Sequence, residues 1–97
     1  MAFSYSDKNF TVVGNLCFVH IVVQGKTATY AIPQAIRDRM LVDNFACAYY
    51  TINSRTRGVV KPTDNIGFAV IYSGNIECIG QLDSGYLYFY FPIDSNK

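Results

Sequence analysis

The residues best suited to chemistry in this chain are three cysteines, one histidine and seven carboxylates. A nucleophilic site needs a thiol or hydroxyl beside a base, and Cys17 and His20 are the closest such pair in sequence. Three residues apart on a strand, their side chains project to opposite faces of the sheet, which excludes direct cooperation. His20 lies in phase with Phe18 and Val22, which favours a packed or interface histidine over a catalytic base.

The carboxylates form no pair close in sequence. They are Asp7, Asp38, Asp43, Asp64, Glu77, Asp83 and Asp94, and most flank expected turns, where an aspartate ordinarily caps backbone N–H groups. The seven glycines are scattered as turn residues instead of gathered in a phosphate-binding loop. We therefore expect a protein that is not an enzyme.

The cysteines are odd in number and far apart, at Cys17, Cys47 and Cys78. Each lies in an apolar stretch, which favours small buried thiols in a reduced protein. There is no Cys-x-x-Cys pair, and one histidine cannot complete a usual zinc site at these spacings. The sequence thus predicts no metal and no other cofactor.

The charge and apolar content of the chain argues against nucleic-acid and membrane partners and favours self-association. Charged residues make up 15% of the chain and the net charge is +1, against a norm of about 25% charged residues. Dispersed Lys and Arg argue against a nucleic-acid partner. The longest apolar run, Leu16–Val23, is shorter than a membrane span, so no membrane insertion is expected. A small domain with 51% apolar residues is expected to oligomerise.

Short β-branched and aromatic runs between turn residues predict an all-β fold, a compact antiparallel sandwich or barrel of seven or eight short strands. The expected strands are residues 10–13, 16–23, 27–32, 45–52, 59–60, 66–72, 76–82 and 85–94. The strand at residues 16–23 has apolar residues at both sets of alternate positions and is therefore expected to be buried on both faces. Residues 34–42 are the one helix-like segment, long enough for a turn or two. In the hairpin at Ser73–Asn75, Gly74 and Asn75 are expected to take positive φ.

These elements fit one domain. We expect residues 1–9 to be a flexible lead without a signal peptide, residues 10–94 a single β head domain, and residues 95–97 a tail.

The last strand carries the most informative pattern. Leu87, Phe89 and Phe91 fall on one face of it, as a core strand requires. The other face carries Tyr86, Tyr88 and Tyr90, whose apolar rings are costly to leave in water. We therefore predict an oligomer interface formed by His20, Tyr86, Tyr88 and Tyr90.

Four segments, in this order, resemble parts of phage tail-fibre and receptor-binding domains. They are Val12–Val19 with its Gly-Asn turn, Ala31–Arg39 with its proline-ended strand and basic loop, the hairpin Ile71–Ile76, and the closing Phe91–Pro92–Ile93–Asp94. The last is similar to the chain end of receptor-binding heads of phages that infect lactic-acid bacteria. The resemblance covers residues 10–94.

The resemblance implies a trimeric β head at the phage tail tip or baseplate, made in the bacterial cytoplasm and carried on the virion. Such a head contacts other phage tail proteins and binds a host cell-wall saccharide near subunit boundaries. The polar His/Asp/Arg set of those heads is not matched at Phe68–Ile71 or at Tyr86–Tyr88. We therefore assign saccharide contacts to other residues, namely Tyr49, Arg55, Arg57, Asp64 and Asn65.

Two alternatives remain open. One is a structural tail or capsid assembly module that has no glycan site. The other is a small barrel that binds single-stranded nucleic acid, against which the near-zero net charge argues.

Overall fold

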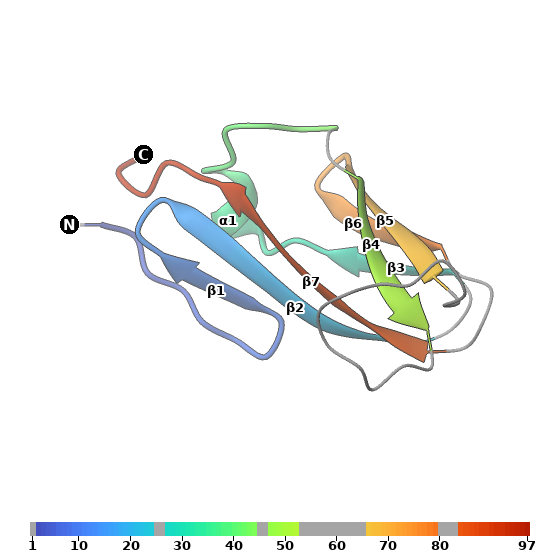
Figure 1. Cartoon of the computed structure of the whole chain (residues 1–97). Coiled ribbons are helices and arrows are strands. Elements are labelled where there is room, and N and C mark those ends of the chain that lie inside the picture. The colour runs from blue at the N-terminus through green and yellow to red at the C-terminus, as the bar shows by residue number, and fades with distance from the viewer. Residues whose placement is uncertain (1, 25–26, 45–46, 53–65, 80–83) are drawn as a thin grey trace.

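The computed structural model describes residues 2–24, 27–44, 47–52, 66–79 and 84–97. Within them lie seven strands and a single helical turn (Figure 1). The strands are β1 (Phe10–Val13), β2 (Leu16–Gln24), β3 (Thr27–Ala31), β4 (Cys47–Ile52), β5 (Ile66–Tyr72), β6 (Asn75–Ile79) and β7 (Ser84–Pro92), and the helix is α1 (Gln34–Arg37). The predicted all-β antiparallel fold is confirmed. The short strand expected at residues 59–60 lies outside the described residues.

The strands are hydrogen-bonded in the order β1-β2-β7-β4-β5-β6-β3, and every pairing is antiparallel. Figure 1 shows β1, β2 and β7 in one half of the molecule, and β4, β5, β6 and β3 in the other. Strand β3, at the far end of the order, comes back near β2. The sheet therefore curls over itself, and both halves turn one face toward a shared core.

That core takes alternate residues from strands of both halves, as the period of two requires. Its fully buried members include Cys17 and Val23 from β2, Leu87 and Phe91 from β7, Ile71 from β5, and Ile76 and Cys78 from β6. The short helix α1 starts after Pro33 and adds Ile36, which is also fully buried. Because α1 is one turn long, burial of Ile36 holds it in place more than helix propensity does.

Strand β2 differs from its expected environment. Its inward residues are buried, whereas Phe18 is 38% exposed and Val22 is 56% exposed. The prediction that β2 is buried on both faces is therefore wrong. The strand lies inside the sheet, between β1 and β7, but no described element packs on the outer face of β1, β2 and β7. A continuous apolar run does not distinguish a doubly buried strand from one with an exposed apolar face.

The hairpin between β5 and β6 is the tight turn that the sequence predicts, but its two residues with positive φ lie one position earlier than expected. Positive φ falls on Ser73 (51°) and Gly74 (76°), while Asn75 already belongs to β6 and pairs with Tyr72. Two successive residues with positive φ match the right-handed twist of the flanking strands. The prediction of positive φ at Asn75 is therefore wrong.

Both chain ends contact the sheet. The Phe3 N–H donates to the Ser95 carbonyl at 2.9 Å, and the Ser95 hydroxyl donates to the Gly14 carbonyl. The Arg39 guanidinium lies 3.9 Å from the centre of the Phe3 ring, and the Val12 N–H donates to the Tyr5 carbonyl at 2.9 Å. Phe3, Tyr5 and Ser95, which lie in the segments expected to be a flexible lead and a tail, thus contact the head domain.

The hairpin supplies a stability prediction. Ser73→Asn should stabilise the domain by about 0.5–1 kcal/mol, because asparagine tolerates the left-handed region better than serine. Thermal unfolding followed by circular dichroism should show a midpoint higher by a few degrees. Ser73→Ala is the matched control and should show no gain. Equal midpoints for Ser73→Asn and Ser73→Ala would contradict the strain assigned to this turn.

Candidate binding surface

The most unusual surface of the protein is the outer face of β1, β2 and β7. Because side chains alternate and the three strands are in register, their outward residues form continuous rows. We call these residues the aromatic face: Thr11, Val13, Leu16, Phe18, His20, Val22, Tyr86, Tyr88, Tyr90 and Pro92. Tyr88 is 56% exposed and Tyr90 is 62% exposed. Large apolar side chains this exposed, and this close together, are typical of a contact surface.

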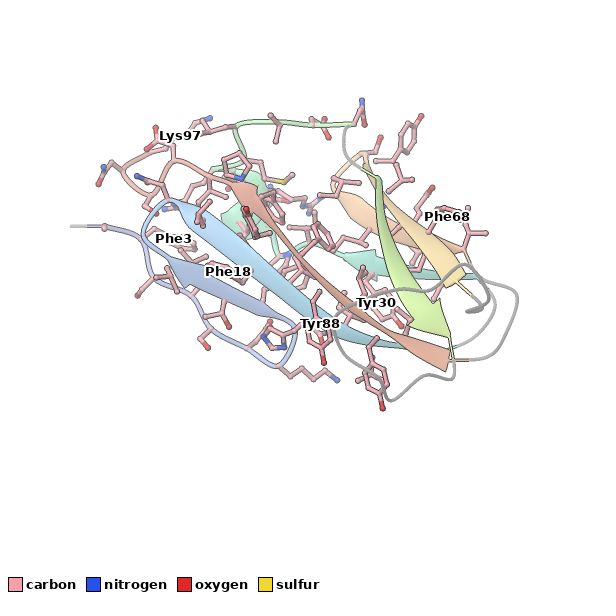
Figure 2. The ribbon with its side chains drawn as sticks, in the orientation of Figure 1. Phe3, Phe18, Tyr30, Phe68, Tyr88 and Lys97 are labelled. Carbon is pink, nitrogen blue, oxygen red and sulfur yellow. The ribbon has the colours of Figure 1, made fainter. Side chains whose placement is uncertain are left out.

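The register of β2 and β7 sets the arrangement on this face. His20 pairs with Tyr88 at the centre, flanked by Phe18 with Tyr90 and by Val22 with Tyr86. The Phe18 and Tyr90 rings lie 5.6 Å apart, centroid to centroid, and are tilted by 44°. Figure 2 shows Phe18 and Tyr88 on this half of the sheet. The four residues predicted for an oligomer interface thus share one exposed face, and their interface role remains a prediction.

Two open hollows flank the central pair. One, of about 520 Å³, is lined mainly by Phe18, His20, Tyr88 and Tyr90. The other, of about 440 Å³, adds Lys8, Asn9, Val22 and Tyr30 to the same central pair. The first is largely apolar and the second carries more polar groups. Both hollows depend on His20 and Tyr88.

A short turn before β1 places polar groups beside His20. The Asp7 carboxylate accepts the N–H groups of Asn9 at 2.8 Å and Phe10 at 2.7 Å, and the Tyr5 hydroxyl donates to it at 2.9 Å. The backbone carbonyl of Asn9 accepts a hydrogen bond from the backbone N–H of His20 at 2.9 Å. On its side chain, His20 Nε2 lies 3.4 Å from Thr11 Oγ1.

The same contacts keep Asp7 ionised. Partial desolvation acts to raise the pKa of its carboxyl, but the hydrogen bonds from Asn9, Phe10 and Tyr5 and the nearby His20 outweigh it, so the pKa lies below its ordinary value. The turn is thereby fixed by a charged acceptor, and it holds Lys8 and Asn9 at the rim of the aromatic face.

The buried thiols are unsuited to nucleophilic chemistry. Cys17 and Cys78 are fully buried and free. Burial, aided by the charge of Asp7, raises the pKa of Cys17 to about 12, and burial raises that of Cys78 to about 11. Cys17 faces the core while His20 lies on the opposite face, as the strand period predicts. Among the described residues, no three His, Cys, Asp or Glu side chains lie close enough to hold a metal ion.

Of the residues proposed for saccharide contacts, the structure describes the backbone of Tyr49 alone. Tyr49 belongs to β4, where its backbone pairs with Phe68. Arg55, Arg57, Asp64 and Asn65 lie outside the described residues. Their assignment therefore remains a prediction. What the sequence analysis missed on the aromatic face is the exposure of Phe18 and Val22. The available signal was the polar His20 between them, at a phase where a buried strand would be apolar.

The thiols give a direct chemical prediction. In a Cys47→Ser background, Cys17 and Cys78 should react with Ellman's reagent at pH 8 far more slowly than a free thiol, because the native protein holds them protonated and covered. Two thiols should then react rapidly in denaturant. A thiol that reacts at the free-cysteine rate in the native protein would contradict the burial described above.

Asp7 gives a pH prediction. Since its folded pKa lies below its unfolded value of about 3.9, ionised Asp7 stabilises the fold above that pH, and this contribution is lost as pH falls through the folded pKa. Asp7→Asn keeps the acceptor oxygen and removes the charge. We expect the variant to be less stable than the wild type at pH 6–8, with the difference shrinking toward pH 3, in urea unfolding curves. A difference that stays constant across this range would contradict the account.

Comparisons of this chain with protein-family models, curated proteins and solved structures give no match. Among the described residues, no helix is long and apolar enough to cross a membrane. The resemblance to phage receptor-binding heads therefore rests on the sequence segments alone, and function has to be inferred from the chain's own residues and geometry.

Proposed function

We propose that this protein is a non-enzymatic adhesion module of a phage tail tip, which associates with partner subunits and holds a host cell-surface saccharide. The observation that carries this proposal is the aromatic face, a broad exposed surface centred on His20 and Tyr88. Such a surface is costly in water unless a partner covers it. The all-β fold and the order of segments in residues 10–94 support the phage setting.

The chemistry of the chain suits adhesion better than catalysis. Tyrosine offers a flat apolar ring and a hydroxyl, the combination that sugar rings and protein interfaces both use. By contrast, the two thiols the structure describes face the core, with pKa values raised well above the physiological range. The saccharide contacts are assigned, as before, to Tyr49, Arg55, Arg57, Asp64 and Asn65.

A second candidate is a structural tail or capsid module without a glycan site. It is favoured by the absence of formal charge on the described side chains of the aromatic face when His20 is neutral. An interface core is depleted of charged residues in this way. Under this candidate, association of subunits is the whole function.

Saccharide binding tests the proposal. Purified wild-type protein should bind cell walls, or an array of cell-wall glycans, from lactic-acid bacteria. The double variant Arg55→Ala/Arg57→Ala and the variant Tyr49→Ala should each bind about tenfold more weakly, a loss of about 1.4 kcal/mol, with an unchanged unfolding midpoint. Lys97→Ala, at the exposed chain end, is the control.

The outcomes separate the two candidates. Full binding by both variants would remove these residues from the site. A wild-type protein that assembles but binds no cell wall or glycan would overturn saccharide adhesion and leave the structural module.

A further inference from the structure

The exposed area of the aromatic face matches what a second protein subunit covers. Its apolar members Val13, Phe18, Val22, Tyr86, Tyr88 and Tyr90 are 38% to 62% exposed. Since a buried aromatic side chain accounts for about 150–250 Å², the four rings together leave on the order of 400 Å² uncovered, and the exposed Val13 and Val22 add to this area. The smaller stable interfaces bury about 600 Å² on each partner, a value that the partly exposed His20 and Leu16 help to reach.

The composition of the face argues for a partner that is equally uncharged. None of the described side chains on it carries a formal charge when His20 is neutral. A strongly charged ligand would find no counter-charge in its centre. A second copy of the same face would be such an uncharged partner, because its rings can pack on rings and its hydroxyls and imidazole can hydrogen-bond each other.

The strand register makes the face complementary to its own copy. Consider a two-fold axis between two facing sheets, parallel to β2 and β7 and midway between them. Such an axis places β2 of each copy over β7 of the other, at the same height along the strands. Residues that are register partners within one chain then also face each other across the interface.

We propose that the aromatic face is covered by a second copy of this chain, packed sheet on sheet about a two-fold axis. This inference rests on the association role in the proposed function and names the partner for it. His20 faces the partner's Tyr88 at the centre, and Tyr88 faces the partner's His20. Phe18 meets the partner's Tyr90 on one side, and Val22 meets the partner's Tyr86 on the other.

The central pair explains why polar groups lie in an apolar face. A buried imidazole and a buried phenol need hydrogen-bond partners, and the two-fold axis supplies two reciprocal bonds between them. The facing sheets pack about 10 Å apart, and both are twisted, so the contact is closest at the centre and opens toward Val13 and Pro92 at one end of the strands.

Light scattering on a sizing column tests the inference. We expect the wild type to elute with a mass of about 22 kDa, twice the 10.9 kDa of one chain. Tyr88→Asp should halve this mass, because an unpaired carboxylate would be buried between the sheets. Tyr72→Asp is the matched control, since Tyr72 on β5 is 55% exposed against 56% for Tyr88, and it should stay a dimer. Circular dichroism checks that all three proteins are folded.

Cross-linking tests the geometry. In a Cys47→Ser background, His20→Cys and Tyr88→Cys variants are mixed and treated with a bis-maleimide whose span is about 10 Å, the sheet separation. Each variant, alone or mixed, should form linked dimers, because strands about 4.8 Å apart and sheets about 10 Å apart place His20 and Tyr88 of one copy within about 11 Å of both positions on the other. Thr11→Cys, on β1, should link far less, because the axis separates its two copies by about 17 Å. The natural thiols Cys17 and Cys78 are buried and should not compete.

Several outcomes would overturn the inference. A wild-type monomer at about 100 µM, a hundredfold above a micromolar dissociation constant, would show that no second copy covers the face. A trimer, the number implied by the resemblance, would overturn the two-fold arrangement, and a dimeric Tyr88→Asp would move the interface elsewhere. A monomer that still binds saccharide would sink this inference alone, whereas a dimer without saccharide binding would sink only the adhesion function.

Discussion

The nine-residue pairing of β2 with β7 is the interaction on which the rest of the structure depends. Its inner side chains, among them Val23 and Leu87, are fully buried in the core. Its outer side chains form the aromatic face around His20 and Tyr88. Because side chains alternate in a strand, one ladder fixes both surfaces at once, and a slip of a single residue would exchange them.

Because one ladder fixes both surfaces, packing of the core on one face leaves an apolar face exposed to water. The core is assembled from both halves of a curled sheet, so one face of β1, β2 and β7 is fully occupied by packing. Nothing in the described structure covers the opposite face, although its side chains are nearly as apolar. The turn at Asp7 and the contacts of Phe3 and Ser95 instead secure the margin of this half. These hydrogen bonds restrain the margin of the exposed face, and such pre-organisation favours association by lowering its entropic cost.

Local sequence patterns predicted most of the fold. Strand β1 and the turn at Gly14, whose φ is 61°, follow from alternation and from glycine's freedom at positive φ. The period of two also placed His20 opposite Cys17 and put Tyr86, Tyr88 and Tyr90 on one face. Burial was harder to predict. Whether Phe18 and Val22 are covered depends on which layers pack together, and no local sequence pattern encodes the packing of layers. The contacts of Phe3 and Ser95 were missed for the same reason, since they join opposite ends of the chain.

The central claim is that the aromatic face is covered in the working protein. Photochemically induced dynamic nuclear polarisation measures the solvent access of the rings on this face directly, because a dye in solution polarises only the tyrosine and histidine rings that it can contact. With rising protein concentration, the signals of His20, Tyr86, Tyr88 and Tyr90 should fade together while that of Tyr72 persists. Face signals that stay as strong as the Tyr72 signal at every concentration would contradict the account.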